Sequence, residues 1–211
     1  MTTLVKICGL STPETVDAAL EAGADFVGLV FFPKSPRNVL LRQAAGLAAQ
    51  ARGRARVVTL VVDAEDALLT DIAEAVRPDL IQAHGSETPE RLARIRLLTG
   101  IPAYKALRVR SVTDVAKAAD YVSSPFILYD AMPPEGAALP GGNGLAFDWT
   151  ILKDAARPFM LAGGLTPENV DKAIASTAAA MVDVSSGVES APGIKDITRI
   201  RKFIEAAKAS G

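Results

Sequence analysis

Short apolar runs rich in β-branched residues alternate along the chain with longer segments that have a helical apolar period. Runs of the first kind are typical of buried strands, and segments of the second kind are typical of amphipathic helices. Strands are predicted at Leu4–Cys8, Asp25–Phe31, Ala55–Val62, Asp79–Ala83, Ala103–Val109, Phe126–Asp130, Phe159–Gly163 and Met181–Ser185. Helices are predicted at Pro13–Ala22, Leu41–Ala51, Glu65–Val76, Pro89–Thr99, Val112–Ala118, Trp149–Ala155, Pro167–Ser176 and Asp196–Ala209.

The spacing of these strand–helix units predicts the architecture. Successive strands begin about 21 to 33 residues apart, which suits βα units joined by short loops. A helix after each strand implies a parallel sheet, because every parallel connection must cross over. Eight such units in 211 residues favour an α/β fold, the (β/α)8 TIM barrel, as a single domain over residues 1–211. The rival is an open doubly wound sheet, but the only fingerprint-like glycine cluster, Gly141–Gly144, follows a proline-rich loop instead of a strand.

Three predicted helices open with the same tripeptide, Thr-Pro-Glu, at Thr12–Glu14, Thr88–Glu90 and Thr166–Glu168. Thr can cap the first free N–H groups, Pro suits the first helical position, and Glu meets the positive helix end. The repetition in units one, four and seven favours a barrel of similar units. Residues 131–147 form the one long irregular loop, and it follows the sixth strand on the face where barrels keep their active sites.

Composition and charge narrow the class of protein. Apolar residues make up 49% of the chain and the formal net charge is -1, which argues for a packed core and against a nucleic-acid partner. The one cysteine excludes an internal disulfide and fits a reducing compartment. No signal peptide or membrane-length apolar run is visible, so we expect a cytoplasmic protein without a membrane partner. We find no metal-ligand spacing and expect no cofactor, and the sequence leaves monomer and homodimer open.

The strand ends meet at one face of a parallel barrel, where ligands bind. Period-two alternation turns Lys6 and Cys8 of the first strand inward, together with Asp183 and Ser185 of the eighth. Barrel closure makes these strands neighbours, so we expect Asp183 to pair with Lys6. The pair either fills the barrel as a buried charge pair or takes part in catalysis, and both readings stay open. Further polar residues at strand ends are Asp63, Gln82, His84, Lys105 and Arg108.

Cys8 and Asp130 are candidates for acid–base chemistry. A lone cysteine is most often a small buried apolar residue, but an inward position beside Lys6 would lower the thiol pKa and make it a usable base. Asp130, on the opposite wall of the mouth, could be its acid partner or an ordinary loop ligand. His84 lies four strands away in order, so a thiol–imidazole pair with Cys8 is not expected.

Two strand-to-turn segments could grip an anion with their backbone N–H groups. One carries Gly163 and Gly164 after the seventh strand, and the other carries Ser185, Ser186 and Gly187 after the eighth. Either turn alone is a weak signal, because small residues after a strand usually form only a turn. Arg37, held between prolines in the loop after the second strand, has the fork that grips a carboxylate, although a solvated surface arginine is the plain alternative.

Taken together, these motifs resemble the phosphoribosylanthranilate isomerases of tryptophan biosynthesis. The resemblance covers essentially the whole chain in the right order, and its motifs are specific as a set. They are Lys6–Leu10, Gly23–Gly28, Ser35–Arg37, Ile81–Gly85, Asp130, Gly141–Gly144, Phe147–Trp149, Leu161–Leu165, Pro167–Val170, Val182–Glu189, Pro192–Gly193 and Lys195–Asp196.

The resemblance implies an Amadori rearrangement of N-(5-phosphoribosyl)anthranilate to 1-(2-carboxyphenylamino)-1-deoxyribulose 5-phosphate, without a cofactor. It implies that Asp130 is the general acid and that Cys8 is the base. It further implies that Arg37 holds the anthranilate carboxylate and that Asp183 lies near the ribose. By the same resemblance, Gly164, Ser186 and Gly187 fall in the turns that hold the phosphate.

The sequence departs from the family pattern at two positions. Ala83 stands where the family usually has Leu, and since it should face the helices we expect only a packing change. Asn143 stands where the family often has Thr, in the loop over the site. Two other functions stay open: another phosphosugar barrel enzyme, such as the histidine-pathway Amadori isomerase or an epimerase, and a non-catalytic phosphate-binding barrel. The other phosphosugar barrel enzymes are expected to use paired carboxylates or a metal, whereas Cys8 here takes the place of one carboxylate.

Overall fold

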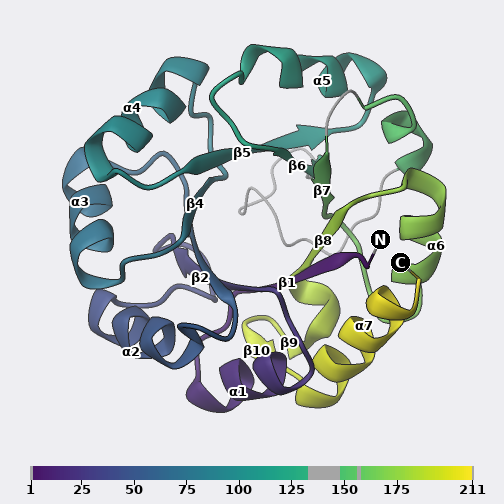
Figure 1. The fold of residues 1–211 in the computed structure, drawn as a ribbon, viewed down its shortest axis with the longest axis horizontal. Coiled ribbons are helices and arrows are strands. Elements are labelled where there is room, and N and C mark those ends of the chain that lie inside the picture. The colour runs from purple at the N-terminus through teal and green to yellow at the C-terminus, as the bar shows by residue number, and fades with distance from the viewer. Residues whose placement is uncertain (1, 133–147, 156–157, 211) are drawn as a thin grey trace.

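A computed structural model describes residues 2–132, 148–155 and 158–210, and its central feature is a closed barrel of eight parallel strands (Figure 1). The strands follow one another around the barrel in chain order: β1 (Leu4–Cys8), β2 (Phe26–Phe31), β3 (Arg56–Val61), β4 (Leu80–Ala83), β5 (Ala103–Val109), β6 (Ile127–Ala131), β7 (Phe159–Leu161) and β8 (Met181–Val184). The predicted (β/α)8 fold is therefore confirmed, and the open doubly wound sheet is wrong.

Helices surround the barrel (Figure 1). They are α1 (Pro13–Glu21), α2 (Leu41–Ala51), α3 (Asp66–Ala75), α4 (Pro89–Thr99), α5 (Val112–Ala116), α6 (Val170–Thr177) and α7 (Ile197–Ala209), with 3-10 turns η1 (Lys117–Asp120), η2 (Trp149–Leu152) and η3 (Ser186–Val188). The barrel closes by pairing of β1 with β8, in a register that sets Lys6 opposite Asp183. This register places the two predicted partners side by side.

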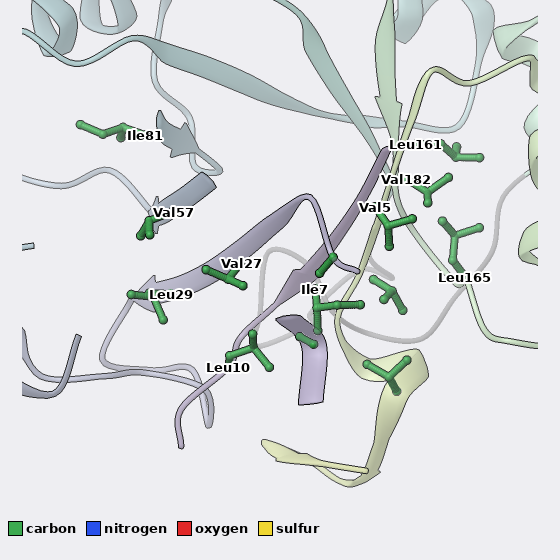
Figure 2. Packing of buried hydrophobic residues seen from close by; sticks show 14 of the residues in the cluster. Val5, Ile7, Leu10, Val27, Leu29, Val57, Ile81, Leu161, Leu165 and Val182 are labelled. Carbon is green, nitrogen blue, oxygen red and sulfur yellow. The ribbon is translucent and has the colours of Figure 1, made fainter. Parts of the chain in front are cut away.

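Apolar side chains of the barrel form two layers, separated by the alternation of each strand. The outer layer joins strand residues such as Val5, Ile7 and Ile81 to helix residues, and Figure 2 shows part of it around β1. The inner layer contains only side chains from the strands and their ends: Phe26, Val58, Leu80, Tyr104, Ala106, Phe126, Leu128, Met160, Ala162 and Met181. Ala83 belongs to the outer layer, as expected for a packing position. A polar residue that lies two positions along a strand from one of these inner-layer residues therefore also points into the barrel.

Four segments differ from the sequence-based expectation. The helix predicted at Trp149–Ala155 is only the 3-10 turn η2, and the α-helical part of the segment after β5 ends at Ala116. Thr12 and Thr88 cap α1 and α4 as predicted, but α6 begins at Val170, not at the third Thr-Pro-Glu copy. The sequence also gave no hint of a hairpin, β9 (Glu189–Ala191) and β10 (Ile194–Lys195), before α7.

The late start of α6 has a local cause. The side chain of Asn169 accepts a hydrogen bond from Thr166 N at 2.7 Å and donates one to the carbonyl oxygen of Gly164 at 2.9 Å. These bonds hold residues 166–169 as a turn against the end of β7, so the helix begins only after Asn169. Of the long loop after β6, residues 133–147 lie outside the described part of the chain, as do Gly141–Gly144 and the departure at Asn143.

Candidate active site at the carboxyl ends of the strands

Cys8 ends β1 and points into the barrel mouth, as the alternation predicts. Its neighbour across the β1–β2 pair is Gly28, and a Cβ built there would lie 3.0 Å from the sulfur of Cys8 and 3.2 Å from Cε of Lys6. Gly28 therefore leaves the room that both side chains occupy. Cys8 is only 3% exposed, so the site holds its thiol away from bulk water.

The predicted lowering of the thiol pKa is wrong for this structure. Burial raises the pKa of Cys8 above 9.0, and the nearby charge of Lys6 only partly offsets it. Lys6 itself stays charged: burial lowers the pKa of its amine, but the charge of Asp183 and the hydrogen bond to it offset this effect, and the pKa is raised. The effect of burial on the pKa of Cys8 thus outweighs that of the Lys6 cation, because a fully enclosed thiolate loses its hydrating water.

Lys6 starts a chain of buried polar side chains. Its ammonium nitrogen lies 2.9 Å from Oδ1 of Asp183, which confirms the predicted pair, and 2.9 Å from Oε1 of Gln82. The hydroxyl of Tyr104 donates to the same Gln82 oxygen at 2.8 Å. Because this oxygen accepts two bonds, the amide nitrogen of Gln82 is the atom that faces Nδ1 of His84, 2.7 Å away.

That arrangement fixes the tautomer of His84. An amide nitrogen can only donate, so Nδ1 of the ring must accept and the ring proton lies on Nε2. Nε2 is 3.2 Å from Oδ2 of Asp130, so the N–H of the neutral ring lies beside this carboxylate, although among the described residues the angles between the two groups are not those of a hydrogen bond. His84 therefore presents its N–H to Asp130.

Asp130 lies near the end of β6, where two backbone features hold its carboxylate. Its Oδ1 accepts a bond from the N–H of Ala131 at 2.9 Å, and the residue is 6% exposed. A Cβ on Gly163 would come within 2.5 Å of Ala131 N and 2.9 Å of Asp130 Oδ1, at a φ of +85°. Only glycine permits this approach without strain, so the end of β7 packs directly on the candidate acid.

The two glycine-containing turns are neighbours, as a shared anion site requires. A Cβ on Gly187 would lie 1.8 Å from the carbonyl oxygen of Leu165, so the turn after β8 is pressed against the turn after β7. Gly164 has a φ of +67°, and among the described residues its N–H has no acceptor. Ser185 ties the same region to β1 through a 3.2 Å bond from its hydroxyl to the carbonyl of Cys8.

Arg37 is buried at 6% exposure, so the solvated-surface reading is wrong. Its Nε and Nη2 donate to the two carboxylate oxygens of Glu189 at 2.7 and 2.8 Å. Lys195 also reaches Glu189 Oε1 at 2.8 Å and the carbonyl of Ser185 at 2.9 Å. Burial raises the pKa of Glu189, but the bond from Arg37 and the charge of Lys195 outweigh it and leave the pKa lowered. Sequence reasoning assigned no role to either hairpin residue.

Lys105 does not belong to this mouth. It pairs in register with Ile127 and Ala83, which both face the helices, and its Nζ lies 2.9 Å from Oε2 of Glu87. Glu87 in turn accepts bonds from the backbone N–H of Asp63 and of Gly85, both at 2.8 Å. Among the described residues, no group of three or more His, Cys, Asp and Glu side chains could hold a metal ion.

Comparison with known proteins decides the family. The family model described as "PRAI: N-(5'phosphoribosyl)anthranilate (PRA) isomerase" matches residues 5–206. The chain belongs to the N-(5'-phosphoribosyl)anthranilate isomerase family. A relative of that name from Rhodopseudomonas palustris (strain BisA53) is 56% identical over 209 residues, covering 98% of this chain and 96% of the relative. Another from Rhizobium meliloti (strain 1021) is 50% identical over 212 residues, covering 99% and 98%.

Solved phosphoribosylanthranilate isomerases share the fold closely. The enzyme from Thermotoga maritima superposes with a TM-score of 0.88 at 37% identity, covering 98% of this chain and 99% of that one. A second structure, in complex with reduced 1-(o-carboxyphenylamino)-1-deoxyribulose 5-phosphate, has a TM-score of 0.85 at 35% identity with the same coverage. The chain is thus an isomerase of tryptophan biosynthesis that catalyses the Amadori rearrangement, as the sequence led us to expect.

Proposed function

We propose that Cys8 is the general base and Asp130 the general acid of this Amadori rearrangement. The observation that carries the assignment is the buried chain Lys6–Gln82–His84, which begins beside Cys8 and ends beside Asp130. Cys8 and Asp130 lie at or near the carboxyl ends of β1 and β6, on different walls of the barrel mouth. A base and an acid placed apart can act on two atoms of one substrate without neutralising each other.

The proposed chemistry has three steps. Asp130, in its protonated form, gives its proton to the furanose ring oxygen while the bond from that oxygen to C1 breaks, and a Schiff base forms. Cys8, as thiolate, takes the C2 proton, and the electrons of that C–H bond make an enolamine. A proton then moves from the C2 hydroxyl to C1, which gives the ketone. Because burial keeps the resting thiol protonated, each turnover begins with transfer of a proton from Cys8 to Asp130, which makes the thiolate and the acid together. In the three steps the thiol regains one proton and the carboxyl loses one, so the cycle closes.

We further propose that the two anionic ends of the substrate are held on either side of this chemistry. The backbone of Gly163, Gly164, Ser185, Ser186 and Gly187 would receive the phosphate, supported by the contact between the two turns. Arg37 would receive the anthranilate carboxylate. This is supported by its burial beside Gly9, which follows Cys8: a Cβ added to Gly9 would lie 2.7 Å from Cδ of Arg37.

Asp183 is proposed to lie near the ribose. Asp183 is the last residue but one of β8, its side chain points into the barrel towards Lys6, and the residue is 7% exposed. The charge of Lys6 keeps it from being an unpaired buried anion.

Substitution of the two acid–base groups tests the assignment. Cys8→Ala and Asp130→Asn should each lower turnover by about 10²–10⁴-fold, the usual contribution of a positioned acid or base. Turnover is followed by the loss of anthranilate-type fluorescence. Glu21→Gln, which removes an exposed ion pair with Arg201, is the control and should keep normal turnover. Near-normal turnover in either active-site variant would remove that residue from the proposed pair.

The same preparation tests the wider reading of partners. We propose a phosphoribosyl small molecule as substrate, a cytoplasmic location, and either a monomer or a homodimer. A related solved structure is of monomers generated from the dimeric enzyme of Thermotoga maritima, so light scattering should be run at several concentrations. Among the described residues, no helix is both long and apolar enough to cross a membrane. An assay with the histidine-pathway substrate would show whether the chain also accepts it.

A further inference from the structure

The hairpin β9–β10 connects the two regions that are proposed to hold the ends of the substrate. On one side, Lys195 donates to the carbonyl oxygen of Ser185 at 2.9 Å and to its hydroxyl at 3.3 Å. On the other side, the turn at Gly193 packs on the loop after β2, where a Cβ on Gly193 would lie 2.6 Å from the carbonyl oxygen of Pro36. The hairpin thus touches both the phosphate turn and the loop that carries Arg37.

Glu189 is the centre of this connection. Its Oε1 accepts from Arg37 and from Lys195, and its Oε2 accepts from Arg37 and, at 3.2 Å, from the N–H of Gly193. The side chains of Glu189, Arg37 and Lys195 are 4%, 7% and 1% exposed. Water therefore screens these contacts little, and charge-assisted bonds of this length are strong.

The geometry of the guanidinium gives the contact a direction. Glu189 binds the edge formed by Nε and Nη2. A guanidinium is planar and rigid, so fixing one edge also fixes where the remaining edge points. Lys195 then fixes Glu189 relative to Ser185, which sets the place of Arg37 relative to the phosphate turn.

We propose that Glu189 is a positioning residue for the substrate carboxylate: it orients Arg37 and sets its distance from the phosphate turn. This rests on the proposed function, in which Arg37 binds the anthranilate carboxylate. Glu189 does not touch the substrate and acts only through Arg37. Preorganising a binding group in this way strengthens binding by removing the cost of ordering it.

The direction in which the affinity for a carboxylate changes, when Glu189 loses its charge, separates this role from simple electrostatics. Arg37, Lys195 and Glu189 together carry one net positive charge, so removal of the Glu189 charge by Glu189→Gln would leave two. If Glu189 merely competes for Arg37, the variant should bind a carboxylate more tightly. If Glu189 positions Arg37, the variant should bind it more weakly.

The test compares two probes on the whole chain: reduced 1-(o-carboxyphenylamino)-1-deoxyribulose 5-phosphate and the same compound without the carboxyl group. Glu189→Gln should weaken binding of the first probe about tenfold, the order expected when one orienting partner is lost, and change the second less than about twofold. In an Arg37→Ala background the same change should have no further effect, because non-additivity marks residues that act together. The control is Glu21→Gln on its exposed pair.

Equal weakening of both probes, unchanged binding of both, or tighter binding of the first would each overturn the proposal. If Glu189→Gln does not fold, as judged by thermal unfolding, Glu189→Asp carries the comparison, because it keeps the charge but shortens the reach to Arg37. It should also weaken only the carboxylated probe. A native chain that binds both probes equally would instead refute the assigned role of Arg37, which is a failure of the proposed function and not of the role of Glu189.

Discussion

Two buried lysine–carboxylate pairs have the same separation but different surroundings. Lys6 of β1 lies 2.9 Å from Asp183, and Lys105 of β5 lies 2.9 Å from Glu87. Both lysines sit in strands and are at most 3% exposed. They differ in the direction of their side chains: Lys6 points into the barrel, whereas Lys105 points towards the helices, like its neighbour Ile127.

The partners of the two pairs show what each pair does. Lys105 also donates to the carbonyl oxygens of Ala83 and Gly85, and Glu87 accepts from two backbone N–H groups, so this pair holds the loops after β3 and β4. Lys6 instead donates to a side chain, Gln82, and through it reaches His84. A buried pair that binds backbone supports the fold, whereas one that binds side chains at the mouth can serve the chemistry.

The largest effect is expected from removing one charge of each pair. Glu87→Gln and Asp183→Asn should each cost about 3–5 kcal/mol of unfolding free energy, because each leaves a buried lysine without its counter-charge. Only Asp183→Asn should also lower kcat/KM of the folded protein, by about a hundredfold, because only that pair belongs to the proposed site. Denaturant unfolding and turnover corrected for folded protein measure the two effects. Equal losses of turnover would break the distinction between the pairs.

A smaller effect should separate the two ring nitrogens of His84. Gln at this position can place an amide N–H near the former Nε2, facing Asp130, whereas Asn places its amide near the former Nδ1, facing Gln82. His84→Gln should therefore keep about tenfold more turnover than His84→Asn, because the contact between Nε2 and Asp130, misaligned here, is worth about one hydrogen bond to a charged group once bound substrate aligns it. Both variants remove the imidazole, so each is the other's control. Equal activity would mean that the N–H beside Asp130 does not matter.

The smallest effect concerns the pH at which Cys8 reacts. Its pKa is raised above 9.0 by burial, so the folded thiol stays protonated at a pH where an unfolded one ionises. Alkylation by iodoacetamide should be slow at pH 8 and rise only as the pH passes the folded pKa. By linkage, the contribution of the neutral Cys8 thiol to the free energy of unfolding is fully present below pH 9.0 and is lost as the pH rises above it. Rapid alkylation at neutral pH would show that Lys6 outweighs desolvation after all.

Most of the barrel was predictable because it depends on local and periodic information. Strand runs such as Leu4–Cys8 and the caps at Thr12 and Thr88 follow from alternation and capping chemistry. Barrel closure then makes the pair Lys6–Asp183 foreseeable. The start of α6 was missed because a side chain, Asn169, binds a backbone carbonyl five residues away, and no helical period records that contact.

The candidate site was only partly predictable. The alternation of Gln82 and His84 signals that both point inward, but neither their tautomer nor their link to Asp130 is written in β4 alone. The sequence by itself determined the fold, the family and which strand ends face the mouth, since these depend on period and order along the chain. Only the tertiary structure decided that Arg37 is held by Glu189 and that burial raises the pKa of Cys8. Both depend on distances between residues far apart in sequence and on how much water their packing excludes.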